Sequence, residues 1–398
     1  TLGSTTLIIT PSNAAGSGLS VGLIVNVNVP VPSISYGWDT GSSDVLSMGY
    51  ANNKVTAGYF HTCAILDNGD LKCWGYDGSG TLGDGGSTNT NLNAPSSTAI
   101  DLGTGRTAVA VSAGSSHTCA ILDNGDLKCW GDDYYGQLGD GGTNTDINAP
   151  SSTAIDLGTG RTAVAVSTGN IHTCAILDNG DLKCWGHDNA GQLGDGGTNT
   201  DTNAPSSTAI DLGTGRTAVS VTAGGFHTCA ILDNGDLKCW GDDVYGQLGD
   251  GGSNTDTNAP SSTAIDLGTG RTAVAVSARV FHTCAILDNG DLKCWGFDGY
   301  GQLGDGGSNT DTNAPSSTAI DLGTGRTAVA VSAGGYHTCA ILDNGDLKCW
   351  GWDDYGQLGD GGSNTNTNAP SSTAIDLGTG RTAVAVNAGR GGSCLLYT

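Results

Sequence analysis

Short, β-like apolar runs separated by turn residues make up most of this chain. Residues 301–351 contain four of them, TAIDL, TAVAVSA, HTCAIL and DLKCWG, with the turn sequences GTGR and DNGD between them. The unit recurs at a constant interval, because HTCAILDNGDLKCWG begins at His117, His172, His227, His282 and His337, and an earlier copy begins at His61. Four strands in a unit of this length predict the blade of a β-propeller.

The last unit is incomplete, and its missing part is expected at the other end of the chain. After six complete units the C-terminus supplies TAIDL, TAVAVNAG and GSCLLYT. The fourth run is expected in SISYGWDTGS, where Ser35 takes the position of the cysteine and Tyr36 that of the tryptophan. We therefore predict an all-β fold, a seven-bladed propeller over residues 35–398 that is closed by three C-terminal strands and one N-terminal strand, which removes the open edges. Cys394 would then face Ser35.

Residues 1–34 belong to no unit and are predicted to form a strand-rich arm. Between residues 19 and 31 every odd position is Leu or Val, which predicts a long strand with one apolar face. Burial of that face would contribute on the order of 10–20 kcal/mol before entropy is subtracted. The arm should therefore pack on the propeller's own outer surface or add as a strand to a neighbouring molecule, and head-to-tail addition propagates into a filament. The residues that would carry assembly are Leu19, Val21, Leu23, Val25, Val27, Val29 and Val31.

Twelve of the 13 cysteines fall in equally spaced pairs, one pair in each complete unit. The turn within a pair is Asp-Asn-Gly, and a hairpin on this turn places Cys119 opposite Cys129. Directly opposed cysteines can form a disulfide, and six disulfides imply an oxidising compartment, so we expect a secreted, extracellular protein. A zinc site that includes His117 is the alternative. Cys394 is expected to be a free thiol or an intermolecular link. The expected disulfides are Cys63–Cys73, Cys119–Cys129, Cys174–Cys184, Cys229–Cys239, Cys284–Cys294 and Cys339–Cys349.

Composition and charge exclude several classes of function. All 39 acidic residues are Asp, the net charge is −24 and the pI is about 4.2, so we expect no nucleic-acid partner, because phosphates require a basic footprint. No apolar run in the sequence is long enough to span a bilayer. The first residue is Thr, and we expect the numbering to start after a removed signal peptide or the sequence to be incomplete.

The run AGxxHTCAIL, followed by NGxLxCWGxDxxGQLGDG, resembles the repeats of the regulator of chromosome condensation family. The match recurs in every blade, over about residues 35–398. The resemblance implies a seven-bladed propeller, and the paired cysteines are closer to a secreted, bacterial-looking branch than to the nuclear exchange factor. The superfamily includes GTPase exchange factors, a secreted β-lactamase inhibitor and many extracellular proteins, so the fold alone assigns no function.

The sequence contains no evident arrangement of a nucleophile and a base, and we expect neither enzyme activity nor a cofactor. The histidine of HTC recurs in every complete unit, which indicates a packing residue. The Asp- and Asn-rich loops, such as GDGGSNTDTNAP, offer oxygen ligands for calcium but lack the spacing and the glutamate of an EF-hand. Side-chain hydrogen bonds within turns are the interpretation that we favour for these loops.

Positions that differ between repeats are the remaining candidates for a binding site. They are the residue after CWG, the residue three positions further on, and the two residues before HTC. Equivalent positions of a propeller lie on one face, and aromatic residues gathered there suit a contact surface, unless these loop positions simply vary freely. The binding-face candidates are Trp38, Tyr76, Tyr135, His187, Tyr245, Phe297, Tyr300, Trp352 and Tyr355.

Two functional hypotheses follow from the sequence. The first is a non-enzymatic extracellular structural protein that polymerises with itself through the arm, as a filament subunit does. The alternative is a secreted binding or adhesion module, or an inhibitor-like propeller, that captures an extracellular protein or a glycan through the aromatic positions. The first predicts long oligomers and the second a monomer with a specific partner.

Overall fold

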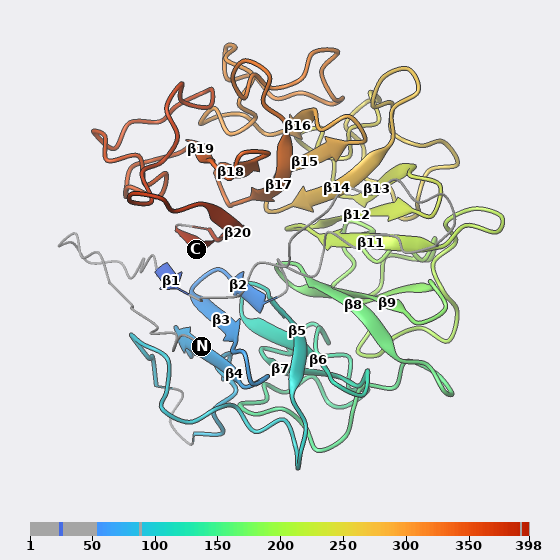
Figure 1. The fold of residues 1–398 in the computed structure, drawn as a ribbon. Helices are drawn as coiled ribbons and strands as arrows, with labels where there is room; N and C mark the ends of the chain where they lie inside the picture. Colours follow the sequence, from blue (N-terminus) through green and yellow to red (C-terminus); the bar gives the residue numbers. More distant parts are fainter. Residues whose placement is uncertain (1–23, 27–53, 87–89, 391, 398) are drawn as a thin grey trace, which may run out of the picture.

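The computed structural model describes residues 24–26, 54–86, 90–390 and 392–397, which form a ring of small β-sheets (Figure 1). The described strands make seven three-stranded sheets, which we number as blades 1 to 7 around the ring, and the predicted all-β propeller is confirmed. The inner strands are β2 (Val55–Ala57), β5 (Ala108–Ala113), β8 (Ala163–Thr168), β11 (Ala218–Ala223), β14 (Ala273–Ala278), β17 (Ala328–Ala333) and β20 (Ala383–Ala388). The middle strands are β3 (His61–Ile65), β6 (His117–Leu122), β9 (His172–Leu177), β12 (His227–Leu232), β15 (His282–Leu287), β18 (His337–Leu342) and β21 (Ser393–Tyr397). The outer strands are β4 (Leu71–Gly75), β7 (Leu127–Gly131), β10 (Leu182–Gly186), β13 (Leu237–Gly241), β16 (Leu292–Gly296), β19 (Leu347–Gly351) and, in blade 7, β1 (Ile24–Asn26).

The prediction of a fourth strand at TAIDL is wrong in the described blades. In blade 2 this run contributes one backbone bond to the outer strand, from Ile155 N to Leu127 O at 2.9 Å. At both ends of the run a side-chain oxygen accepts a hydrogen bond from a backbone N–H. Ser151 Oγ accepts from Thr153 N at 3.2 Å, and Asp156 Oδ1 accepts from Gly158 N at 2.9 Å. These local turns compete with the ladder and leave a single residue to pair.

In blade 7 the described N-terminal strand is not the segment predicted to close the ring. The edge of β21 pairs with β1 in parallel, in the register Ile24 to Leu395, so the closing strand comes from the middle of the predicted arm. On its other edge β21 pairs antiparallel with β20, and Cys394 lies opposite Asn387. The segment predicted for this edge, with Ser35 and Tyr36, lies outside the described residues.

A ring of side-chain bonds joins the inner strands of neighbouring blades. In each step a Ser, Thr or Asn side chain near the end of one inner strand accepts the backbone N–H at the end of the next, at 2.8–3.1 Å. At the seam between blade 7 and blade 1, Asn387 Oδ1 accepts Ala57 N at 2.8 Å and completes the circle through the described residues. The acceptors, from blade 1 to blade 7, are Thr56, Ser112, Ser167, Thr222, Ser277, Ser332 and Asn387.

The core lies between blades rather than within them. The six expected disulfides are all formed in the described part of the chain, with Cα atoms 4.0–4.1 Å apart, and the register places each cysteine directly opposite its partner. In one cluster Cys119 and Cys129 of blade 2 pack against Ala175, Leu177 and Trp185 of blade 3. Because the two sulfurs are bonded to each other, blade 2 has no thiolate for the alternative zinc site at His117.

A hydrogen-bonded chain crosses each of the five interfaces from blade 1 to blade 6. Thr173 Oγ1 donates to Gln137 O at 2.8 Å, and Trp185 Nε1 donates to the same carbonyl at 3.1 Å. His117 Nε2 lies 2.9 Å from Thr173 Oγ1, and since the hydroxyl proton is already used, the imidazole donates there. The loop reaches the indole this closely only with glycine, because a Cβ at Gly139 would lie 2.3 Å from Trp185 Nε1.

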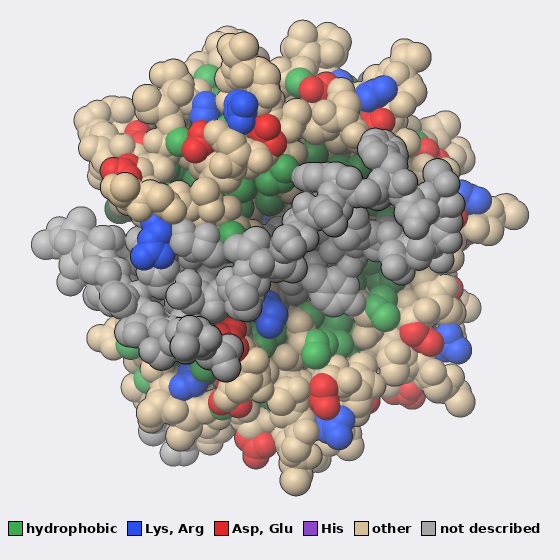
Figure 2. Space-filling model, in the orientation of Figure 1, with side chains coloured by type: hydrophobic (Ala, Val, Ile, Leu, Met, Phe, Trp, Pro, Cys, Tyr) green, Lys and Arg blue, Asp and Glu red, His purple; other side chains and the backbone are tan. Residues whose placement is uncertain are grey.

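The two ends of the inner strands expose different chemistry. Where β5 begins, a bulge between Ala108 and Ala110 turns Val109 out of the ladder, and equivalent valines of blades 2 to 7 are 39–52% exposed. Arg106 forms an ion pair with Asp123 at the same end, at 3.3 Å. Figure 2 shows a face of the ring with hydrophobic side chains toward the centre and basic beside acidic side chains toward the rim. The aromatic candidates lie at the opposite end of these strands.

Candidate functional site: an aromatic face with two arginines

The open end of each middle-to-outer hairpin places the variable positions side by side. In blade 5 the residue after CWG donates its N–H to the residue before HTC, from Phe297 N to Phe281 O at 2.9 Å. Blade 6 repeats this bond from Trp352 N to Tyr336 O, also at 2.9 Å. Two variable positions at opposite ends of one hairpin therefore form one surface, and their side chains can differ while the backbone stays the same.

Seven aromatic side chains from blades 4, 5 and 6 form one continuous cluster on this face, which we call the aromatic patch. The ring centroid of Tyr245 lies 5.0 Å from that of Phe297, and the centroid of Tyr336 lies 5.7 Å from that of Trp352. Most of these contacts are edge-to-face, a geometry that stabilises aromatic pairs beyond the area they bury. The rings are half-buried except for Tyr355, which is 67% exposed. The patch consists of Tyr245, Phe281, Phe297, Tyr300, Tyr336, Trp352 and Tyr355.

The remaining candidates form two smaller groups. Tyr135 and His187 lie in contact, with ring centroids 4.3 Å apart, and Phe226 lies 6.4 Å from His187. Tyr76 contacts Phe60 at 6.0 Å. The structure thus brings five of the predicted residues into the aromatic patch and separates three from it, while Trp38 lies outside the described residues. The sequence selection missed Phe281 and Tyr336, although the variable dipeptide before HTC contains both.

Two arginines near the ends of the inner strands were also not among the binding-face candidates chosen from the sequence. Arg279 of blade 5 reaches across to blade 1, where its Nη2 donates to Ala57 O at 3.1 Å. The guanidinium of Arg390 in blade 7 stacks over Tyr59 of blade 1, with Cζ 4.5 Å from the ring centroid. We call Tyr59, Arg279 and Arg390 the arginine cluster. The available signal was a departure from the repeat, because other units have glycine where blade 5 has Arg279.

The buried histidines belong to the scaffold. His61, His117, His172, His227 and His282 are buried, and burial lowers the pKa of each imidazole to about 3. They are neutral at physiological pH and bond to the next blade, which confirms their interpretation as packing residues. A general base that must exchange protons near neutral pH requires a pKa close to that pH, which these imidazoles do not have.

Buried aspartates also recur at equivalent loop positions. Asp243 Oδ1 accepts Leu248 N at 2.9 Å, and burial raises the pKa of this carboxyl to about 6. Burial raises the pKa of Asp298 to about 7. Perturbed acids often mark active sites, but here the same residue and the same bond return in every complete blade. They therefore hold the loop rather than define one site.

The Asp- and Asn-rich loops contain the turn bonds that the sequence favours. Asp140 Oδ1 accepts Gly142 N at 2.7 Å, for example. Within the described ranges no three His, Cys, Asp or Glu side chains form a group suited to a metal ion. The expectation of no cofactor, with calcium at these loops as the less favoured alternative, stays a prediction. The described residues also contain no helix with the length and hydrophobicity needed to cross a membrane.

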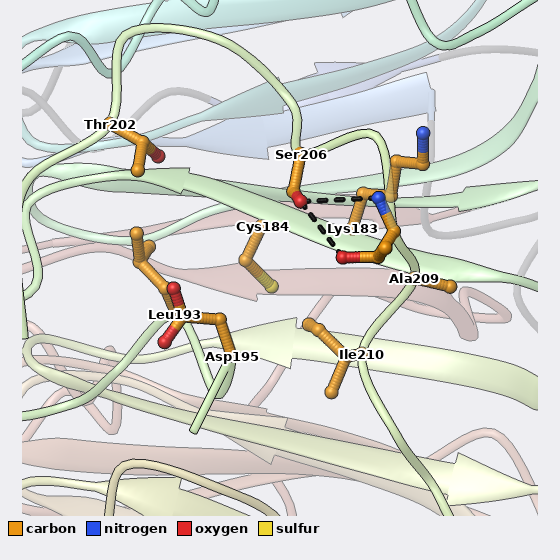
Figure 3. A pocket seen from close by; sticks show the side chains of 9 residues that line it. Lys183, Cys184, Leu193, Asp195, Thr202, Ser206, Ala209 and Ile210 are labelled. Atoms are coloured by element: carbon orange, nitrogen blue, oxygen red, sulfur yellow. Dashed lines mark hydrogen bonds between the residues drawn. The ribbon is translucent and has the colours of Figure 1, made fainter. Parts of the chain in front are cut away.

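A small cavity lies between β10 and the loop that follows it in blade 3 (Figure 3). Its volume is about 40 Å³, enough for a few water molecules, and the disulfide-bonded Cys184 lines it together with Lys183 and Ile210. Lys183 Nζ donates to Leu157 O at 3.0 Å. Figure 3 shows Ser206 bonded within its own loop rather than to a neighbour that would activate it. This cavity is a structural feature of the blade.

Known proteins resemble the chain over most of its length. The profile of the RCC1-like domain matches residues 26–395. The ultraviolet-B receptor UVR8 of Arabidopsis thaliana is 32% identical over 310 residues, which cover 77% of this chain and 66% of the receptor. The human E3 ubiquitin-protein ligase HERC2 is 29% identical over 305 residues, which cover 76% of this chain and 6% of the ligase. The match thus spans just under two thirds of the receptor and a small part of the ligase.

Solved structures share the fold. Yeast RCC1 (Prp20), in its complex with Kap60, superimposes with a TM-score of 0.72 at 20% identity, covering 85% of this chain and 78% of that one. Human WBSCR16 gives a TM-score of 0.72 at 22% identity, covering 84% of both chains. Since the family profile extends through all seven blades and the same motif returns in each complete unit, the chain belongs to the RCC1-like domain family.

Proposed function

We propose that this protein is a binding module that holds a protein partner on the aromatic patch. One observation carries the proposal: the patch is built from positions that vary between otherwise near-identical repeats, and those positions are aromatic and contiguous in blades 4 to 6. Clustered aromatic residues are typical of the centre of a protein interface, where they supply most of the binding energy. The scaffold residues, in contrast, return in blade after blade.

The relatives support a protein as the partner. Yeast RCC1 has been solved with Kap60 bound, and the binding of Prp20p to Gsp1p and histones has been studied. Those partners belong to the yeast protein, and their relevance here is that a ring of this fold offers its surface to other proteins. The six buried disulfides support a location in an oxidising, extracellular compartment.

The proposal does not extend to filament assembly through the arm. Ile24–Asn26, in the middle of the alternating run, pairs with β21 of the same chain, which favours the alternative that the arm belongs to the propeller's own fold. The rest of the run lies outside the described residues. Nor does the proposal include catalysis, because the titratable groups with shifted pKa values recur as scaffold in the blades.

A library of random peptides displayed on phage tests the proposal directly. The immobilised wild type should enrich a family of clones, and the combined variant Phe297→Ala, Tyr336→Ala, Trp352→Ala should not. Tyr355→Asp is a milder second variant at the exposed end of the patch. Tyr134→Ala is the matched control, since this tyrosine is 72% exposed but lies outside the patch.

The proposal stands if the selected clones bind the wild type and the control, and bind both patch variants more weakly, by roughly tenfold or more. Thermal unfolding of each variant shows whether the ring is intact. Clones that bind the folded patch variants as well as the wild type would place the contact surface elsewhere and refute the proposal.

A further inference from the structure

We propose that the arginine cluster binds a carboxylate of the partner. The partner is then a peptide segment that presents an Asp, a Glu or a C-terminal carboxylate beside apolar side chains. This inference rests on the proposed function and deepens it, because it names the chemistry that the aromatic patch and the arginines recognise together.

Arg279 occupies a position that is unfavourable for any side chain. At this position Gly58, Gly224 and Gly334 donate their N–H to the carbonyl of the following histidine at 2.7–2.8 Å, whereas Arg279 N lies 3.2 Å from His282 O. A Cβ at Gly224 would lie 2.4 Å from His227 Cε1. The scaffold thus favours glycine here, and its replacement in a single described blade points to a role other than packing.

The guanidinium of Arg279 is not fully hydrogen-bonded among the described residues. Its Nη2 donates to Ala57 O, but its Nε is buried and has no partner among the described residues. Burial lowers the pKa of Arg279 to about 10, so the group keeps its charge at neutral pH. In the part of the chain that the structure describes, no carboxylate lies within ion-pair distance of it, whereas Arg106 and Arg216 each pair with an aspartate at 3.3 Å. A desolvated cation without a counter-ion favours the binding of an anion.

Arg390 brings a second cation to the same place. It stacks over Tyr59, and both arginines lie close enough to the phenol of Tyr59 to oppose the effect of burial, which raises the pKa of that phenol. No aspartate within ion-pair distance of Arg390 is found among the described residues either. Two positive charges therefore lie near one ring, and a guanidinium offers paired N–H donors that suit the two oxygens of a carboxylate.

The arginine cluster adjoins the aromatic patch. Arg279 precedes Phe281 of the patch by two residues, and a Cβ at Gly335, the residue before Tyr336, would lie 2.9 Å from Arg390 Cγ. A carboxylate held by the arginines would therefore be followed directly by apolar contacts. The net charge of −24 repels a strongly acidic partner at long range, which favours a segment with one or a few carboxylates.

The geometry of the rings favours a peptide over an acidic sugar. The planes of Tyr336 and Trp352 are inclined by 83°, and those of Trp352 and Tyr355 by 88°. Neighbouring rings thus present an edge and a face alternately, which makes an uneven surface that apolar side chains can fit. A sugar ring stacks on a flat aromatic platform, and these pairs do not form one.

The test uses two fluorescein-labelled, C-terminally amidated peptides, Leu-Phe-Asp-Phe-Leu and Leu-Phe-Asn-Phe-Leu, which differ only in the carboxylate. Fluorescence anisotropy should show the Asp peptide binding the wild type roughly tenfold more tightly or better, as expected for a charge-assisted hydrogen bond. Arg279→Gly restores the residue of the other blades, so this variant should fold. In both Arg279→Gly and Arg390→Gln, the affinities for the Asp peptide and the Asn peptide should become similar. Arg106→Gln, at the opposite end of the inner strands, is the control and should preserve the difference.

Each outcome decides between the two proposals. Equal affinities of both peptides for the wild type, lost together in the Phe297, Tyr336 and Trp352 variant, would overturn the carboxylate site and leave the proposed function standing. Affinities that the patch variant does not change would refute the proposed function. No binding of either peptide, or displacement of the Asp peptide by sodium glucuronate as effectively as by unlabelled peptide, would overturn the inference. If Arg279→Gly lowers the melting temperature and reduces the affinity for both peptides equally, Arg279 only stabilises the contact between blades 5 and 1, and the inference is overturned.

Discussion

The buried histidines should make the ring unstable in acid, and His227 offers a clean test. Its imidazole is fully buried and lies 2.9 Å from Thr283 Oγ1, and burial, with a smaller effect of His172, lowers its pKa to about 3. In the unfolded chain the pKa is about 6.5. Between these two values the unfolded state binds the proton and the folded state does not. The contribution of His227 to stability is therefore complete above pH 6.5 and is lost as the pH falls, by about 2.7 kcal/mol over two pH units.

The buried aspartates act in the opposite direction. Burial raises the pKa of Asp243 to about 6 and of Asp298 to about 7, so these carboxyls take up protons in the folded state first and stabilise it as the pH falls. Both residues are fully buried. The pH dependence of the wild type alone mixes the two groups. A single histidine replacement separates them, because the aspartate contribution cancels in the difference between the two proteins.

Urea unfolding at pH 7.0 and pH 4.5, with the disulfides intact, measures that difference. We expect the stability advantage of the wild type over His227→Gln to shrink by about 2–3 kcal/mol at the lower pH. Thr283→Val is the matched control: it breaks the same contact but keeps the titrating imidazole, so its deficit should be similar at both values. A deficit of His227→Gln that stays constant between pH 7.0 and pH 4.5 would refute the reasoning.

Three further predictions concern the integrity of the ring. Asn387→Ala, at the seam, should lower the free energy of unfolding in urea by about 1–3 kcal/mol. Ser332→Ala removes the equivalent bond between blades 6 and 7 and should have a similar effect. If only Ser332→Ala destabilises the protein, Asn387 does not close the seam. Replacing Cys229 and Cys239 together by Ser should cost roughly 2–3 kcal/mol in the same assay, and an unchanged midpoint would contradict that value. Val25→Asp, in the strand that pairs with β21, should lower the melting temperature without changing the particle size in light scattering. Smaller particles at an unchanged melting temperature would restore the assembly hypothesis.

The blade is readable from the sequence because its determinants are local. The two cysteines of a pair stand on either side of one Asp-Asn-Gly turn, and hairpin geometry alone places Cys119 opposite Cys129, as the register confirms. The return of the same unit at a constant interval implies that each blade packs on the next, and hence a ring. TAIDL misled the prediction because its apolar pattern is that of a strand, while Ser151 and Asp156 tie its ends into turns.

The candidate site could be anticipated only in part. The variable positions after CWG were visible in the sequence, and five of them do meet in the aromatic patch. The rings that join blade to blade, Phe281 and Tyr336, precede a different strand and become neighbours only when two hairpins stand side by side.

What the sequence determined by itself was the repeated blade, its disulfides and the positions free to vary, all set by contacts within one unit. The tertiary structure alone decided that β1 closes blade 7 and that Arg279 reaches Ala57, 222 residues away. Both contacts join residues that are far apart in the sequence. No local pattern encodes them, because the partners meet only when the circle closes.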